Sequence, residues 1–231
     1  MCAFKVISTQ SYQPRSCVSI CYATRSGGTT LDRDSAGGNP FATALIELSS
    51  LSDIEIGDFP ILLQELTTKI SRGHQLPEWL GAELTVDWRL PKLSLGSKAR
   101  RVALVLVVSD YSDSGRGNLI GAAWDELRVS AMLARNGFSV TQGVGSSREE
   151  ILGAIDTFSK VSRDSDMSII YSTGHGREAE GQVYLIPGDF PISNGYLSTE
   201  LAQSAINVSK LADACSARTM NLVFFAGCRT R

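Results

Sequence analysis

Two residues of the chain have side chains suited to nucleophilic catalysis. Cys228 lies in the segment FFAGCR (224–229) and His175 lies in YSTGHG (171–176), so that 228 − 175 = 53 residues separate them. A cysteine thiolate can attack a carbonyl carbon, and a nearby imidazole can accept the thiol proton and later protonate the leaving amine. The two residue types therefore predict a Cys–His catalytic pair, provided that the fold brings them together.

Each residue alone has a simpler interpretation. A single cysteine after a buried strand is often a small core residue, and a histidine in a glycine-rich turn is often structural. Both residues, however, directly follow apolar runs that predict strands, 167–173 and 221–226. Reactive groups of a parallel sheet gather beyond the carboxyl ends of its strands, and the ends of neighbouring strands lie about 5 Å apart. The combination favours catalysis by His175 and Cys228.

Glycines flank the histidine and leave the backbone around it uncovered. Gly174 precedes His175 and Gly176 follows it. Main-chain N–H groups that converge near a nucleophile can stabilise an oxyanion. We expect the N–H groups of Gly176 and Cys228 to have this role.

Charged residues near the expected sheet edge have two interpretations. Asp110 and Asp113 follow the apolar run 102–108, and they are either solvated loop charges or part of a substrate-specificity pocket. Arg116 and Arg25 would instead suit a pocket for an acidic side chain. We take Asp110, Asp113 and Arg25 as the candidate substrate-binding residues.

The remaining cysteines and the second histidine fit structural roles. The chain has five cysteines in all, and this odd number, with no C-x-x-C pair, argues against a disulfide framework and a structural zinc site. We expect Cys17 and Cys21 to be packed thiols, Cys215 to be structural and His74 to be a solvated turn residue. No metal and no cofactor is expected, and nothing indicates a need for calcium.

Strand and helix signals alternate along the chain. An alternation of this kind predicts a doubly wound, mostly parallel α/β sheet of about six strands in a single domain. Strands are expected at 17–23, 84–88, 102–108, 138–142, 167–173 and 221–226. Helices are expected from Asn39 to about Leu51, from Asp58 to Gly73, at 119–136, from the capping box at Ser147 to about Val161, and from Ser198.

Two of these helices carry apolar faces. In the helix over 58–73 we expect the face of Phe59, Leu62, Leu63, Leu66 and Ile70 to point inward. In the helix over 119–136, one face consists of Ile120, Ala123, Trp124, Leu127 and Ala131.

Composition excludes several classes of function. The apolar share is 43% and the net charge is −2, which leaves no basic surface for nucleic acid or an anionic membrane. The longest apolar run, 102–108, is far shorter than the roughly 20 residues of a membrane span, and the start of the sequence has no signal-peptide pattern. We expect a cytoplasmic protein with a protein or peptide substrate. A regulatory partner and the oligomeric state are left open.

Five segments in the second half of the chain resemble motifs of caspase-like cysteine peptidases. The segment LIGAAWD (119–125) resembles the first-helix motif L-x-G-A-x-x-D, and NGFSV (136–140) resembles G-F-x-V. YSTGHG (171–176) is similar to the histidine box, YLIPGD (184–189) to Y-L-[LI]-P-x-D, and AGCR (226–229) to the cysteine box D-A-C-R. A histidine about 50 residues before the cysteine is also the caspase spacing. The resemblance is nearest to the metacaspase and orthocaspase branch.

One position departs from that branch. Ala226 stands two residues before Cys228, where metacaspase-type enzymes carry an aspartate that helps to bind an Arg or Lys side chain. The animal-caspase box Q-A-C-[RQG]-G is not met either. The resemblance implies cleavage after basic residues, but with an altered pocket.

The first part of the chain resembles the family's small subunit, which normally follows the cysteine. CYAT (21–24) is similar to its strand motif, NPFATAL (39–45) to the helix motif S-P-F-T-x-A-L, and GHQLP (73–77) to G-x-Q-x-P. The resemblance implies a circular permutation with a small-subunit segment at 1–88, a linker at 89–100 and a large-subunit segment at 101–231, forming one compact domain. It also implies that the strand at 221–226 lies parallel and adjacent to the strand at 17–23. The alternative is that residues 1–88 end a separate module.

These observations predict a thiol protease of the caspase clan, a cysteine endopeptidase that uses Cys228 as nucleophile and His175 as proton carrier. A CHAT-type protease of bacterial defence with restricted substrates is an alternative. A non-enzymatic doubly wound binding or scaffold domain, with residues 174–176 as a ligand loop, is another.

Overall fold

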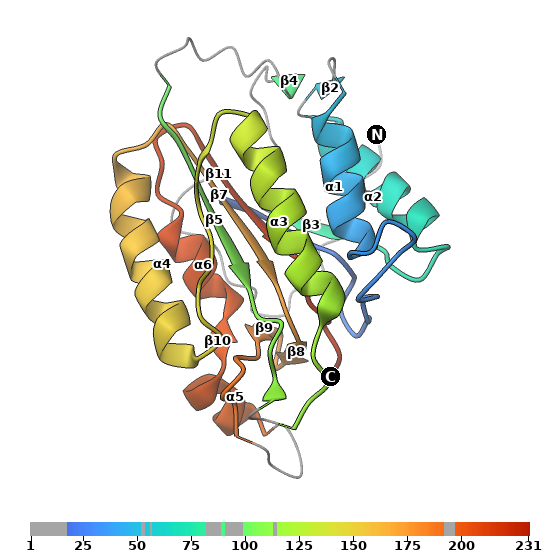
Figure 1. Ribbon diagram of the computed structural model, residues 1–231, viewed down its shortest axis with the longest axis vertical. Coiled ribbons are helices and arrows are strands. Elements are labelled where there is room, and N and C mark those ends of the chain that lie inside the picture. The colour runs from blue at the N-terminus through green and yellow to red at the C-terminus, as the bar shows by residue number, and fades with distance from the viewer. Residues whose placement is uncertain are drawn as a thin grey trace.

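A six-stranded sheet forms the centre of the molecule. The computed structural model describes residues 18–51, 54–55, 57–81, 89–90, 99–112, 115–191 and 197–231. The sheet has the strand order β3-β1-β11-β7-β5-β6 (Figure 1). Its strands are β1 (Val18–Tyr22), β3 (Glu78–Leu80), β5 (Arg101–Val107), β6 (Ser139–Thr141), β7 (Met167–Thr173) and β11 (Met220–Phe225). β3 runs antiparallel to β1, and the other neighbours are parallel.

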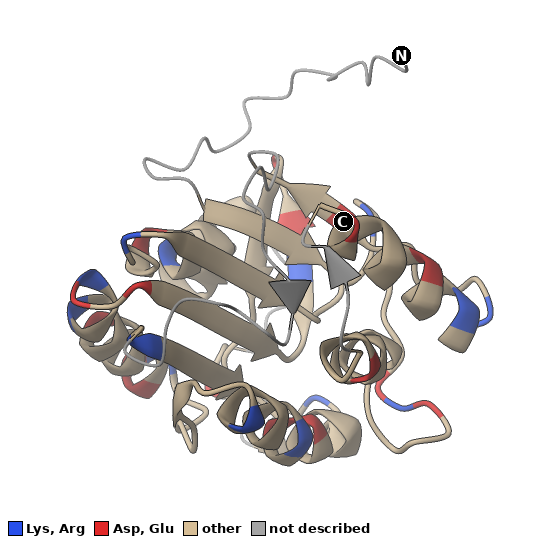
Figure 2. Ribbon diagram, turned by 90° about the horizontal axis from the view of Figure 1, so that it is seen from above, with Lys and Arg blue, Asp and Glu red and all other residues tan. Residues whose placement is uncertain are grey.

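Helices cover both faces of this sheet, as Figure 2 shows from above. One face carries α1 (Pro40–Ser49), α2 (Phe59–Ile70) and α3 (Ile120–Arg135). The other carries α4 (Arg148–Arg163) and α6 (Val208–Ala214), while α5 (Ser198–Ser204) lies beyond the carboxyl ends of the strands, next to β10 (Ile206–Asn207). The charged residues lie mostly on these helices and on loops, whereas the central strands are almost free of them (Figure 2). This three-layer arrangement confirms the predicted α/β fold class.

The central strands separate two hydrophobic cores. β7 and β11 are buried along their whole length, as expected for parallel strands covered on both faces. Because successive side chains of a strand point to opposite faces, Ala103 and Val105 of β5 join the core under α1–α3, and Leu104 and Leu106 join the core under α4 and α6.

Local capping starts two helices where the sequence predicts them. The Asn39 side chain accepts a hydrogen bond from the Phe41 N–H, with Pro40 at the first turn of α1. Ser147 and Glu150 form a reciprocal capping box at α4. The helix from Ser198 is interrupted, because β10 (Ile206–Asn207) separates α5 from α6.

Smaller sheets lie outside the central one. β8 (Gly176–Ala179), β9 (Gln182–Leu185) and β10 form one, and β2 (Ile54–Glu55) pairs with β4 (Arg89–Leu90) in another. β4 occupies the start of the expected linker. The strand expected at 84–88 lies outside the described residues, and the edge strand β3 was not predicted, since a three-residue strand gives almost no alternation signal.

The apolar face of α3 points away from the core. Ile120, Trp124 and Leu127 are 64%, 47% and 59% exposed, whereas Val129, Met132 and Leu133 are buried against the sheet. The buried Asp125, held by hydrogen bonds at the inner side of the helix, fixes this rotation. In α2, by contrast, the predicted face points inward, with Phe59 and Leu63 fully buried.

β1 and β11 are parallel neighbours over Val18–Tyr22 and Asn221–Phe225. Residues 221 − 18 = 203 positions apart therefore pair at the centre of the sheet, as the sequence motifs imply. Downstream of β1, the loop 23–39 runs along the carboxyl edge of the sheet, beside the residues that follow β11.

Candidate active site

His175 and Cys228 occupy equivalent positions on neighbouring strands. Ser172 of β7 pairs with Phe225 of β11, and each candidate residue stands three positions further on: 175 − 172 = 3 and 228 − 225 = 3. Both residues line a single pocket of about 100 Å³ at the carboxyl edge of the sheet. The fold thus brings the predicted pair to one site, where parallel α/β sheets commonly bind ligands.

The histidine ring is oriented by a main-chain carbonyl. His175 Nε2 lies 3.0 Å from the Gly117 oxygen. Because a carbonyl oxygen only accepts hydrogen bonds, this contact assigns the proton to Nε2 and leaves the lone pair on Nδ1. In the neutral ring, Nδ1 is then the nitrogen that can accept a hydrogen bond or a proton.

A buried tyrosine supports the same histidine. The His175 N–H donates to the Tyr111 hydroxyl at 2.8 Å, and that hydroxyl donates to the Ile186 oxygen at 2.9 Å. The two ring centroids are 4.4 Å apart. Tyr111 is fully buried, so it fixes the backbone and the ring plane of His175 together.

The cysteine sulfur contacts a residue of the loop 23–39. Cys228 Sγ accepts a hydrogen bond from the Thr30 N–H at 3.3 Å, and the Thr30 hydroxyl lies 3.4 Å from it. Cys228 is half-buried. Cys21 and Cys215 are fully buried, and burial raises the pKa of both thiols, that of Cys215 to about 12. Among the described cysteines, Cys228 is the one that lines the pocket; Cys2 and Cys17 lie outside the described residues.

Glycine at 176 is a steric requirement of the site. A Cβ atom on Gly176 would overlap the carbonyl oxygen of Cys228, because the two backbones are in contact there. Similarly, a Cβ atom on Gly174 would come within 2.8 Å of the Tyr111 hydroxyl. The two N–H groups expected to hold an oxyanion, those of Gly176 and Cys228, thus belong to backbones that touch.

A buried cation holds the chain directly after the cysteine. The Arg229 guanidinium pairs with Glu178 at 3.0 Å and with Glu78, and it lies 4.3 Å from the centre of the Tyr22 ring. The Arg229 N–H donates to the Gly28 oxygen. Desolvation raises the pKa of Tyr22 to about 12, so this ring stays neutral beneath the cation. The network ties the end of β11 to β1, β3 and β8.

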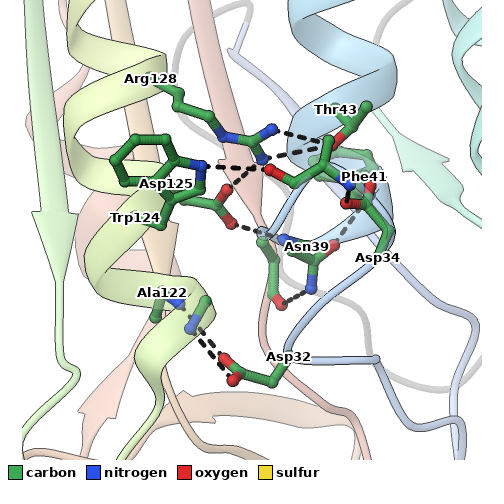
Figure 3. A network of polar contacts seen from close by, with 12 residues as sticks. Asp32, Asp34, Asn39, Phe41, Thr43, Ala122, Trp124, Asp125 and Arg128 are labelled. Atoms are coloured by element: carbon green, nitrogen blue, oxygen red, sulfur yellow. Dashed lines mark hydrogen bonds and ion pairs between the residues drawn. The ribbon is translucent and has the colours of Figure 1, made fainter.

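A second polar network joins the loop 23–39 to α3 (Figure 3). The buried Asp125 carboxylate accepts hydrogen bonds from the Asn39 N–H and from Arg128. Desolvation raises the pKa of Asp125 to about 6. Nearer the pocket, Asp32 accepts from the N–H groups of Gly121 and Ala122 at 3.0 and 3.2 Å and thereby caps α3, whose own N-cap position, Leu119, has no side-chain acceptor.

The candidate specificity residues lie in different places. Asp110 is exposed, does not line the pocket and has a lowered pKa because its carboxylate accepts the Ser112 N–H. Arg25 is also exposed and outside the pocket lining. Arg116 donates to the Phe190 oxygen and lies over the Phe190 ring. Asp113 lies outside the described residues.

Sequence reasoning missed the contribution of the loop 23–39. Thr30, Asp32 and Asn39 all line the pocket with His175 and Cys228. A signal was available: the loop follows a strand expected beside β11, and its paired glycines at 27–28 and 37–38 are typical of a backbone that approaches another segment closely.

Comparison with known protein families shows to which family the chain belongs. The family model of the caspase domain, Peptidase_C14, matches residues 100–231, which is more than half of the chain. The chain therefore belongs to the caspase-domain family and carries a caspase-like cysteine peptidase domain. Among curated proteins, no match was found.

Two further findings concern membranes and metals. Within the described residues, no helix is long and apolar enough to cross a membrane. The same part of the chain contains no group of three or more His, Cys, Asp or Glu side chains arranged to hold a metal ion.

Proposed function

We propose that this protein is a caspase-like cysteine endopeptidase that uses a Cys228–His175 dyad and cuts after basic residues. The observation that carries the proposal is the equivalent position of the two residues, three beyond a paired position of adjacent parallel strands, on the wall of one pocket. The membership of the caspase-domain family supports the same reaction class.

The geometry suggests a sequence of proton transfers. His175 Nδ1 takes the proton of the Cys228 thiol, and the sulfur attacks the scissile carbonyl carbon to give a tetrahedral oxyanion held by the N–H groups of Gly176 and Cys228. The imidazolium then gives its proton to the leaving amine, and a thioester remains. His175 next removes a proton from water, the hydroxide attacks the thioester, and the acid product leaves as the proton returns to sulfur.

The dyad is tested by substitution at each position. Cys228→Ala and His175→Ala are expected to abolish peptide cleavage while leaving the thermal unfolding midpoint close to wild type, since neither side chain belongs to the hydrophobic cores. Cys215→Ala is the control, because its buried thiol is away from the pocket. Full activity of either dyad variant would remove the assignment.

A thiol-directed probe separates a peptidase from a binding module without a substrate. Selective iodoacetamide labelling of Cys228 that is lost in His175→Ala supports the dyad. Labelling of every accessible cysteine at similar rates, unaffected by His175→Ala, supports a ligand-binding or scaffold domain instead.

We also propose that the chain is a circularly permuted relative of the metacaspase and orthocaspase branch. Support comes from the parallel pairing of β1 with β11 and from the place of Thr30, Asp32 and Asn39 in the pocket, while the family model covers residues 100–231. A rearranged chain in which residues 1–90 follow residue 231 should keep the fold and the cleavage activity. Residues 1–17 can span about 55 Å when extended, whereas β1 is only about 17 Å long, so they suffice as a connection.

A further inference from the structure

We propose that Asp32 is the specificity-determining residue of this pocket and binds the guanidinium or ammonium group of the residue preceding the cut bond. This inference rests on the proposed function and names the group that reads the substrate. Of the substrate-binding candidates that the structure describes, neither Asp110 nor Arg25 lines the pocket.

Asp32 lies on the wall of the same pocket as the dyad. It lines the pocket with Cys228 and His175, and Thr30, two residues before it, contacts the Cys228 sulfur. The Asp32 side chain is 29% exposed, so its carboxylate remains accessible from the pocket. A substrate side chain adjacent to the attacked carbonyl would therefore come within reach of this carboxylate.

The charges around the pocket favour a cationic side chain. Of the described residues that line it, Asp32 is the only carboxylate, and no Lys or Arg belongs to the lining. Leu119, Ala122 and Ala226 provide an apolar wall for the aliphatic part of an Arg or Lys side chain. A cation that leaves water needs a partner of opposite charge, and Asp32 is positioned to be that partner.

The Arg33 guanidinium would compete only weakly with a substrate cation for the Asp32 carboxylate. Arg33 Nε lies 3.7 Å from Asp32 Oδ2, but the Arg33 side chain is more than half exposed. An exposed ion pair of this kind contributes little and exchanges readily with another cation. A bound Arg or Lys side chain, enclosed by the pocket wall, would form the stronger pair.

The carboxylate is held in place by the first turn of α3. The Gly121 N–H donates to Oδ2 and the Ala122 N–H to Oδ1. Since each carboxylate oxygen can accept two hydrogen bonds, both oxygens keep one acceptor position for a ligand. The capping contacts thus orient Asp32 for a bidentate guanidinium contact instead of using up its capacity.

The position of Ala226 strengthens the argument. Ala226, two residues before Cys228, lines the same pocket as Asp32. A methyl group on one wall leaves space beside the carboxylate on the other. The negative charge of the pocket is therefore supplied from the loop 23–39.

The test compares peptides that differ only in the charge of one side chain. Cleavage of three fluorogenic peptides is measured, with arginine, its neutral isostere citrulline, or aspartate before the cut bond. For the wild type we expect kcat/KM to favour arginine over citrulline by roughly 10- to 100-fold, the range of a hydrogen bond to a charged group. Asp32→Asn should bring the ratio close to one, whereas Asp110→Asn and the distant Asp156→Asn should leave it unchanged.

A second readout needs no turnover. Agmatine, which carries a guanidinium group, should slow iodoacetamide alkylation of Cys228 in the wild type but not in Asp32→Asn. A ratio that survives Asp32→Asn, or a wild-type preference for aspartate or citrulline, overturns the inference and leaves Asp32 as a cap of α3. If no peptide is cut but agmatine protects Cys228 in an Asp32-dependent way, the cation pocket stands and the endopeptidase function fails. If neither cleavage nor protection occurs, both fail.

Discussion

At the scale of single residues, the candidate site requires a glycine at position 176, because a side chain there would clash with Cys228. Gly176 has no side chain because the Cys228 carbonyl fills the space that a Cβ would need. A methyl group added here should displace the Cys228 sulfur from its contact with Thr30.

The Gly176→Ala variant should therefore lose at least about 100-fold in kcat/KM, since small displacements at a reacting centre have effects of that size. Gly153→Ala is the matched control. A Cβ at Gly153 meets no atom within 4 Å, and alanine in the interior of α4 should stabilise the protein by up to about 1 kcal/mol. Equal activities of the two variants would contradict the close contact between Gly176 and Cys228.

Asp125 makes stability depend on pH in a defined window. Its folded-state pKa of about 6 lies above the ordinary value of 3.8, so the folded protein holds this proton more tightly than the unfolded chain does. The contribution of Asp125 to stability is therefore greatest below pH 4 and falls as the pH rises to 6, by roughly 3 kcal/mol in total.

We predict that the free energy of unfolding changes with pH at a different slope in the wild type and in Asp125→Asn. Between pH 4 and 6, the free energy of unfolding of the variant should rise relative to that of the wild type, because the variant lacks the titrating group. Urea denaturation at several pH values measures this difference. Parallel curves over that window would show that Asp125 ionises in the folded protein as it does in the unfolded chain.

At the scale of elements, the Arg229 network joins strands that come from distant parts of the chain. Glu78 belongs to β3, Glu178 to β8 and Tyr22 to β1, and the Arg229 side chain is buried between them. Removal of one member of a buried ion network leaves its partners without compensation.

We therefore expect Arg229→Ala to lower the free energy of unfolding by about 3–5 kcal/mol. Arg218→Ala, which breaks a largely exposed pair with Asp166, should cost at most about 1 kcal/mol. Adding Glu178→Gln to an Arg229→Met variant should recover part of the loss. Chemical denaturation of the wild type and the four variants gives the comparison, and similar losses for Arg229→Ala and Arg218→Ala would speak against the buried network.

The orientation of α3 provides a further check at this scale. Leu127→Gln should change the free energy of unfolding by no more than about 0.5 kcal/mol, because Leu127 points to solvent. Leu133→Ala should cost about 2–5 kcal/mol, because Leu133 is buried in the core. The reverse order would place the wrong face of the helix against the sheet.

α3 also shows where sequence reasoning reaches its limit. Spacing alone found the helix and its apolar residues, but Ile120, Trp124 and Leu127 lie outside the core. The rotation is decided by Asp125, whose partners Asn39 and Arg128 come together only in the folded protein. The long runs of β5, β7 and β11 were predictable because burial on both faces leaves continuous apolar segments.

The same distinction applies to the candidate site. The positions of Cys228 and His175 at one edge of the sheet could be predicted because strand ends fix them, whereas their catalytic role stays a prediction. The place of Asp32 in the pocket could not be predicted, because an aspartate in a loop has no periodic pattern and that place depends on the position of β1 beside β11. Local sequence patterns do not predict contacts between segments that are far apart in the sequence.

At the scale of the whole molecule, the pocket is made from four segments that lie far apart in the sequence, around residues 30–39, 119–122, 173–175 and 226–228. The contact between the Thr30 N–H and the Cys228 sulfur spans 198 positions, and the hydrogen bond from Arg229 to the Thr24 carbonyl spans 205. The loop closure that such contacts require is entropically costly and slows folding, and chains of this length often populate partly folded states.

This separation has a consequence for the order of events during folding. On dilution from denaturant, far-ultraviolet circular dichroism should recover before peptide cleavage and before rapid alkylation of Cys228, because helices form locally while β1 must still find β11. Simultaneous recovery of circular dichroism, peptide cleavage and Cys228 alkylation would contradict this order of events. A partly folded intermediate would have strands and helices but no assembled pocket. The proposed proteolytic activity should therefore appear only when the native fold has formed.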